Sequence, residues 1–207
     1  IGIAASAKPT EVHLGDVVIG SDVYYYERSK ITPKSTKPEP KMVPADATLW
    51  ANVMALPKWS SELPSERPDK TPDHPKRHFG VIASGEKVLA DEAVREQIAS
   101  GHRKILAIEM EGYGFSRAIW QSFERVRHLV IRGICDDGSA GKNDDWHNYA
   151  AEAAASFAKH FLSDRPLPQK KKGFLLTYKY GIVLLCLVVL SFATVFTGLN
   201  WTTEQTS

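Results

Sequence analysis

The segment Ile105-Leu-Ala-Ile-Glu-Met-Glu111 organises the rest of this sequence. Its four consecutive apolar residues are typical of a buried strand. The strand then delivers two carboxylates, Glu109 and Glu111, to its carboxyl end, where open α/β sheets bind their ligands. Gly112 follows directly and leads into a helical run. The segment therefore predicts a strand, an acidic sheet edge and a helix, in that order.

A second apolar segment, residues 129–135, ends in the same way, in Asp136-Asp137-Gly138. Two strands that each end in acid, with a helix between them, predict a βαβ unit with a carboxylate-lined mouth. Because strands alternate with helices along the chain, the sequence indicates the α/β class. Further strands are expected within residues 1–5, 14–26 and 78–83, and further helices within residues 49–56, 91–99 and 146–161.

Two stretches interrupt this alternation. Residues 27–44 are dominated by Lys, Pro, Ser and Thr, and residues 57–76 contain further prolines and many charges. Such compositions are typical of exposed chain. We therefore predict two surface loops, the first of them with little fixed structure.

The composition limits the classes of protein to consider. A chain of 207 residues with 43% hydrophobic content suits one domain plus an appendage. The net charge of +2 is too small to indicate a nucleic-acid partner. Cys135 lies at a strand end and Cys186 in a long apolar run, so we expect no disulfide and a reducing compartment.

The stretch of residues 181–201 contains no charged side chain and is long enough to cross a bilayer of about 30 Å. Lys170-Lys171-Lys172 precede it, which places the globular part in the cytosol by the positive-inside rule. The alternative is a buried core helix. We therefore expect a single-pass membrane protein with a globular domain at 1–164, a basic linker at 165–179, a transmembrane helix at 180–201 and a tail at 202–207.

Several common site motifs are not met. The glycine-containing run at residues 138–142 lacks the first glycine and the Ser/Thr of a phosphate-binding loop. The acids at 136–145 do not follow calcium-loop spacing, and the histidines form no metal pair at helical spacing. We therefore expect no metal and no cofactor, and the carboxylates at strand ends remain as candidates.

Four segments together resemble the nucleoside phosphorylase and nucleosidase superfamily, which includes purine and uridine phosphorylases and methylthioadenosine/S-adenosylhomocysteine nucleosidase. Residues 107–111 resemble its Val-Glu-Met-Glu signature, and residues 130–136 its Val-Arg-Ala-Ile-Ser-Asp strand. Residues 14–19 resemble its Gly-Asp-Val-Val strand, and residues 82–89 its Ile-Ala-Ser-Gly-Asp stretch. The resemblance runs from Ile1 to about Phe161. It implies a three-layer phosphorylase/hydrolase-like fold with a twisted mixed, mostly parallel central sheet.

The resemblance also implies roles. Glu111 matches the carboxylate that accepts hydrogen bonds from the ribose 2′- and 3′-hydroxyls, a task that suits the several lone pairs of a carboxylate. Asp136 matches the general acid that protonates the leaving purine at N7. The other expected substrate-binding residues are Met110 beneath the sugar, Leu89 where backbone groups read the base edge, Val88 where many relatives carry Phe, and Ala5 where relatives carry a glycine near the sugar. Glu109, at the end of the same strand as Glu111, is also expected to bind the substrate.

Each residue alone has a simpler interpretation. Glu109 and Glu111 can be solvated strand-end residues, Asp136 a turn former and Met110 a core residue. The chain also departs from the family pattern, because Cys135 replaces the usual serine beside the aspartate. The family's first strands are absent, with the acid that activates water, so we expect the sequence to be truncated before Ile1.

The function that we expect is cleavage of the N-glycosidic bond of a purine nucleoside or nucleotide. Hydrolysis is preferred to phosphorolysis, in which inorganic phosphate would be a co-substrate. The alternative is a catalytically inactive, membrane-anchored module that binds a nucleoside as a sensor. The expected partners are the small-molecule substrate, the membrane and further copies of the chain, but not nucleic acid.

Overall fold

The computed structural model describes residues 1–59, 63–122, 126–141 and 143–165. The chain divides into two units, Ile1–Pro166 and Leu167–Ser207, and every described helix and strand belongs to the first. Among the residues described, no helix has the length and apolar character needed to cross a bilayer. The predicted transmembrane segment at 180–201 lies outside them, as do the tail and the linker from residue 166 onward.

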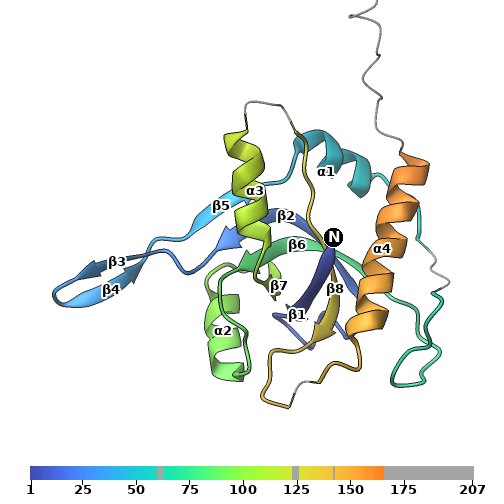
Figure 1. Cartoon of the computed structure of the whole chain (residues 1–207), viewed down its shortest axis with the longest axis horizontal. Helices are drawn as coiled ribbons and strands as arrows, with labels where there is room; N and C mark the ends of the chain where they lie inside the picture. The colour runs from blue at the N-terminus through green and yellow to red at the C-terminus, as the bar shows by residue number, and fades with distance from the viewer. Residues whose placement is uncertain (60–62, 123–125, 142, 166–207) are drawn as a thin grey trace, which may run out of the picture. The chain divides into compact units, whose positions relative to one another are not determined.

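A mixed sheet of six strands forms the centre of the first unit, in the order β5-β2-β6-β7-β1-β8 (Figure 1). Because β8 also pairs with β2, five of the strands close into a small barrel. Strands and helices alternate around it, which confirms the α/β class. The strands are Gly2–Ser6 (β1), Val17–Tyr25 (β2), Lys41–Pro44 (β5), Arg77–Ser84 (β6), Ile105–Glu109 (β7) and Ile131–Asp136 (β8).

The long strand β2 explains how the sheet closes. Its residues 17–19 pair with β8 and its residues 22–25 pair with β5, both in antiparallel fashion. A register shift between Gly20 and Asp22 interrupts its parallel pairing with β6, and such bulges bend and twist a strand. In this sheet three strand pairs are parallel and three are antiparallel. The prediction of a mostly parallel sheet is therefore wrong, because the sheet is evenly mixed.

The predicted βαβ unit is also wrong. Strands β7 and β8 are not neighbours, because β1 lies between them, antiparallel to β7 and parallel to β8. The apolar runs identified both strands but carried no sign that a strand more than a hundred residues earlier inserts between them. As a result, the carboxyl ends of β7 and β8 point toward opposite ends of β1.

A single buried cluster fills the barrel with apolar side chains from all five closing strands, among them Ala4, Val18, Ile82, Ala107 and Ile134. The alternate residues of β2 and β8 face outward, where Val17, Ile19 and Ile131 pack against the helices α1 (Ala47–Met54) and α4 (His147–Asp164). Helix α4 lies close to β8, since a Cβ atom at Gly133 would come within 1.9 Å of the Ala150 carbonyl oxygen. Helix α2 (Glu92–Ser100) covers β6 and β7 through Ile98.

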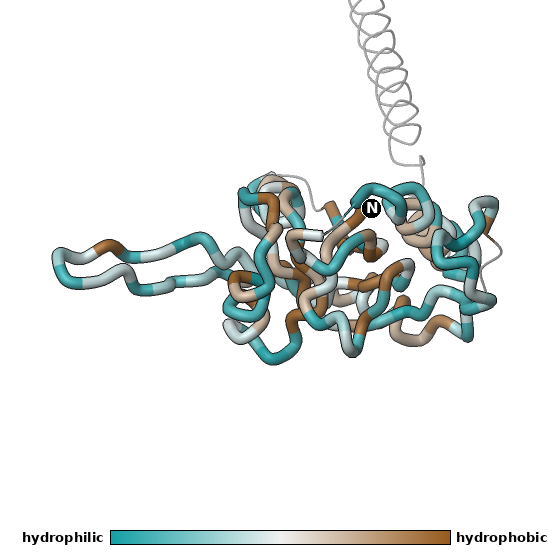
Figure 2. The backbone as a smooth tube through the Cα atoms, turned by 90° about the horizontal axis from the view of Figure 1, so that it is seen from below, coloured by the Kyte–Doolittle hydropathy of each residue, from teal (hydrophilic) through white to brown (hydrophobic). Residues whose placement is uncertain are grey.

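The stretch 27–44, predicted as a loop with little fixed structure, is ordered instead. It contains a hairpin of β3 (Ser29–Thr32) and β4 (Ser35–Pro38), followed by β5. The hairpin projects away from the barrel and is mostly hydrophilic (Figures 1 and 2). Its residues are nearly all exposed, so they show no apolar alternation from which a strand could be predicted.

Candidate active site

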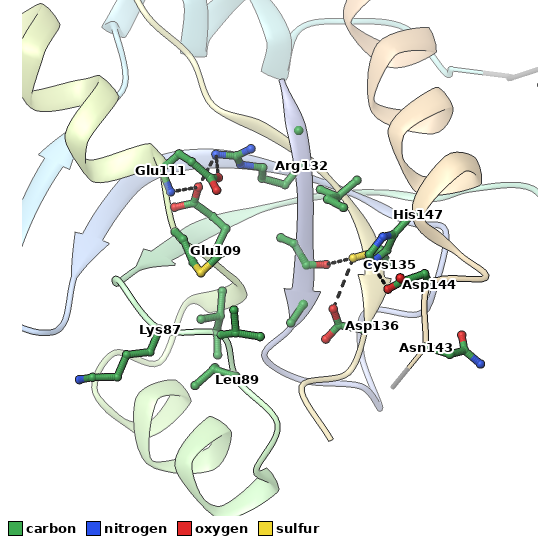
Figure 3. A pocket seen from close by; sticks show the side chains of 17 residues that line it. Lys87, Leu89, Glu109, Glu111, Arg132, Cys135, Asp136, Asn143, Asp144 and His147 are labelled. Atoms are coloured by element: carbon green, nitrogen blue, oxygen red, sulfur yellow. Dashed lines mark hydrogen bonds and ion pairs between the residues drawn. The ribbon is translucent and has the colours of Figure 1, made fainter. Parts of the chain in front are cut away.

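A pocket of about 590 Å³ lies along β1, with Gly2, Ile3, Ala4 and Ala5 in its wall (Figure 3). All seven residues that the sequence predicts as catalytic or substrate-binding line this pocket. They are Asp136, Glu111, Met110, Glu109, Leu89, Val88 and Ala5. The fold thus brings the whole predicted set together, while the roles of its members stay predictions.

The register of β1 sets the length of the pocket. Gly2 pairs with Arg132 and Ala5 pairs with Asp136. Three residues of strand cover about 10 Å, at roughly 3.3 Å per residue. Figure 3 shows a polar group at either end of this distance. We call Glu109, Glu111 and Arg132 the arginine end, and Cys135, Asp136 and His147 the aspartate end.

Glu109 is buried at the arginine end, with 6% of its surface exposed. Its carboxylate accepts hydrogen bonds from the backbone N–H groups of Glu111 at 3.1 Å and Gly112 at 2.8 Å, and from the Arg132 guanidinium. The Gly112 N–H is the first of helix α3 (Gly112–Gln121), a position where a negative charge is favourable. Internal partners therefore use most of the acceptor capacity of Glu109, which was predicted to bind substrate.

Glu111 is held differently from Glu109. Its side chain is 64% exposed, and one carboxylate oxygen lies 3.1 Å from Arg132 Nη2. The remaining acceptor positions are open to the pocket, which Glu111 lines together with the half-exposed Met110. A carboxylate fixed on one side by an arginine and open on the other is well suited to accept two neighbouring hydroxyl groups.

Arg132 was not predicted as a site residue. It lies on β8 with 8% exposure, bridges the two glutamates and occupies space that any side chain at Gly2 would fill. Its Nε has no hydrogen-bond partner among the described residues. One signal for it was available, because a charged residue in the middle of an apolar strand is rare unless it is paired.

Asp136 ends β8 and is half-buried. Its Oδ1 accepts a 2.7 Å hydrogen bond from the backbone N–H of Gly138, and its Oδ2 lies 3.4 Å from Cys135 Sγ. Gly138 has a φ of +67°, a left-handed conformation that favours glycine. A tight turn therefore fixes the direction in which the Asp136 carboxylate faces the pocket.

The buried Arg95 of α2 holds the same turn from outside. Its Nη1 donates a 2.8 Å hydrogen bond to the Asp137 carbonyl oxygen. Hydrogen bonding from Ser139 lowers the pKa of the Asp137 carboxyl, and the Arg95 charge acts in the same direction. Because α2 follows the segment that contains Val88 and Leu89, Arg95 links the two walls of the pocket.

His147, the first residue of α4, completes the aspartate end and was also missed. One ligating atom from each of Cys135, Asp136 and His147 lies within 4.8 Å of the others. The sequence carried no signal for this contact, since His147 is eleven positions beyond Asp136 and does not share an element with it.

The chain matches the family model of the phosphorylase superfamily over residues 1–163. The ATP nucleosidase Cap17 of Escherichia coli is 39% identical to it over 82 residues, which are 40% of this chain and 16% of the relative. A death domain-containing ATP nucleosidase of Amphimedon queenslandica is 25% identical over 179 residues, covering 79% of this chain and 33% of the relative. The chain thus spans at most about a third of either relative.

Among solved structures, the 5′-methylthioadenosine/S-adenosylhomocysteine nucleosidase from Neisseria meningitidis, in complex with methylthio-immucillin-A, has the same fold. It aligns with a TM-score of 0.60 at 18% identity and covers 79% of this chain and 67% of its own. These matches confirm the resemblance inferred from the four sequence motifs. The chain belongs to the phosphorylase superfamily.

Proposed function

We propose that this domain cleaves the N-glycosidic bond of a purine nucleoside or nucleotide, with water as the acceptor. The observation that carries the proposal is that Glu111, which contacts Arg132, and Asp136 line opposite ends of one pocket. Arg132 and Asp136 pair with Gly2 and Ala5, which lie about 10 Å apart along β1. A purine nucleoside separates its ribose hydroxyls from N7 by several ångströms, and a hydrogen bond at each end adds about 2.8 Å. One nucleoside therefore fits between the two carboxylates.

In this arrangement Glu111 accepts hydrogen bonds from the ribose hydroxyls, and Met110 packs beneath the sugar. Breaking the bond leaves an oxocarbenium-like sugar and places negative charge on the base. Asp136, at the other end, delivers a proton to N7 and so makes the base a better leaving group. Val88 and Leu89 line the pocket wall that we assign to the base.

Hydrolysis is favoured over phosphorolysis by the relatives, since the two curated relatives named above are nucleosidases, as is the solved structure. The names of the two curated relatives specify ATP, and the name of the solved structure specifies methylthioadenosine and S-adenosylhomocysteine. A substrate with an adenine base is therefore the first choice for this chain, and the 5′ substituent is the variable to test.

The experiment is release of free base from the full chain, measured by chromatography with adenosine, methylthioadenosine and ATP as substrates, with and without inorganic phosphate. We expect free adenine without phosphate in the wild type and a large loss in Asp136→Asn. Asp145→Asn is the matched control, because Asp145 is an exposed acid of the same loop that does not line the pocket. Ligand binding without base release from any substrate would contradict the proposal and favour a sensor.

A further inference from the structure

The aspartate end contains a combination of side chains that the proposed reaction does not require. Cys135 and Asp136 come from the end of β8, His147 comes from the start of α4, and their ligating atoms lie within 4.8 Å of one another (Figure 3). We propose that these three residues form a binding site for Zn²⁺, and that zinc bound there blocks the reaction by taking the Asp136 carboxylate.

The donor atoms fit zinc in type. Thiolate, imidazole and carboxylate are the three side-chain ligands that Zn²⁺ takes in proteins, and three protein ligands leave a fourth position for water. Among the three donors, the Cys135 thiolate is the soft ligand, and a hydroxyl group in its place would bind zinc much more weakly.

The distances also fit. Tetrahedral zinc, with bonds of about 2.3 Å to sulfur and about 2.1 Å to oxygen, separates these two ligands by roughly 3.5 Å. The distance between Cys135 Sγ and Asp136 Oδ2 is 3.4 Å. The His147 nitrogen must then approach the other two ligands by at most about 1.3 Å, and its side chain is 41% exposed, so rotation of the ring meets little resistance.

The surroundings support a bound imidazole. Asp144 Oδ1 lies 3.4 Å from His147 Nε2, so that with zinc on the other ring nitrogen, Nδ1, this carboxylate would fix the orientation of the imidazole and raise its basicity. The Cys135 thiol donates a hydrogen bond from Sγ to the Ala4 carbonyl oxygen, at 3.6 Å. Zinc displaces that proton to solvent, the S–H bond is replaced by a Zn–S bond, and binding becomes weaker as the pH falls.

The test of the site uses the full chain carrying Cys186→Ser, so that Cys135 is the sole thiol. Titration with Co²⁺ as a spectroscopic substitute, followed by displacement with Zn²⁺, should show one ion per chain and a thiolate-to-cobalt charge-transfer absorption. Cys135→Ser and His147→Gln should each weaken binding by more than about 100-fold, and Asp144→Asn by about 10-fold. His74→Gln is the control, because this exposed histidine lines a different pocket and should bind as before.

The site would be overturned if Cys135→Ser bound the metal with unchanged affinity. It would also be overturned if the parent protein, which carries only Cys186→Ser, showed no charge-transfer absorption. The blocking effect rests on the proposed function and is measured separately, as base release at saturating zinc before and after a chelator. In the parent protein we expect zinc to abolish base release and the chelator to restore it. In Cys135→Ser we expect zinc to leave the remaining rate of base release unchanged. Bound zinc with an undiminished rate would overturn the blocking effect, whereas absence of base release in metal-free protein would overturn the proposed function and leave the binding result to stand.

Discussion

The two ends of the pocket hold their carboxylates in opposite ways. At the arginine end, Glu109 is buried and bonded to a guanidinium and to two backbone N–H groups. At the aspartate end, Asp136 is half-buried and faces a turn amide, a thiol and the open pocket. In the proposed reaction the two ends divide the work: the arginine end, which is part of the fold, presents a fixed binding group, and the aspartate end keeps an acid available for proton transfer.

The largest effect on the difference between the two ends is expected from Asp136→Asn. The amide keeps the hydrogen-bonding shape, since its oxygen can still accept from Gly138, but it cannot deliver a proton. Loss of a positioned general acid should lower kcat by about 10²–10⁴-fold, roughly 3–5 kcal/mol of barrier. Substrate binding should change far less, because the proton moves mainly in the transition state. A rate equal to that of the wild type would remove Asp136 from the chemistry.

Arg132→Met, unlike Asp136→Asn, should act mainly on stability and destabilise the fold. It leaves the buried Glu109 carboxylate without its cation, which typically costs about 3–5 kcal/mol. Urea denaturation measures this change in the free energy of unfolding. Asp136→Asn should stay close to the wild type in the same experiment.

A double variant, Arg132→Met with Glu109→Leu, sharpens this test. Replacing both members of a buried ion pair by apolar residues is often neutral, so the free energy of unfolding should recover much of its loss. If the double variant is no more stable than Arg132→Met alone, the ion pair is not the source of the destabilisation.

Glu111→Gln should weaken substrate binding without a comparable loss of stability, since the side chain is mostly exposed. The amide removes the charge and half of the acceptor capacity that the ribose hydroxyls would use. We expect about 1.5–3 kcal/mol weaker nucleoside binding by titration calorimetry. Equal affinities in the two forms would exclude Glu111 from the ribose contact.

The smallest expected effect comes from the turn that aims Asp136. Gly138→Ala places a Cβ on a residue with φ of +67°, which should cost roughly 1–2 kcal/mol of stability and reduce the rate by misplacing the carboxylate. Gly141→Ala is the matched control in the same loop, because its Cβ would meet no atom closer than 4.0 Å and should change stability by less than about 0.5 kcal/mol. Equal effects of the two substitutions would show that the turn does not position Asp136.

The sequence was informative where a candidate residue lies at the end of a single strand. Glu111 and Asp136 follow apolar runs, and all seven predicted residues line one pocket because each lies at the end of a strand or in the turn after it. The sequence did not predict the site residues whose position depends on the packing of one element against another. His147 reaches Asp136 through the packing of α4 on β8, and Arg132 reaches the glutamates because β1 brings β7 and β8 together.

The same limit explains the errors in the fold. The closure of the barrel depends on a bulge in β2, and the order of the strands depends on the insertion of β1, neither of which leaves a periodic pattern. Local patterns report which face of an element is buried, but they do not report which element covers it.

The central position of β1 has a consequence for how the protein is made. Its partners are separated from it by long stretches of chain, since Ala5 pairs with Ile108 and Gly2 pairs with Arg132. Contacts between residues so distant in sequence form late and slow down folding. During synthesis, the wall of the pocket is made long before Glu111 and Asp136 leave the ribosome. A partly synthesised chain therefore has no assembled pocket, and the pocket is complete only after almost all of the domain has been translated.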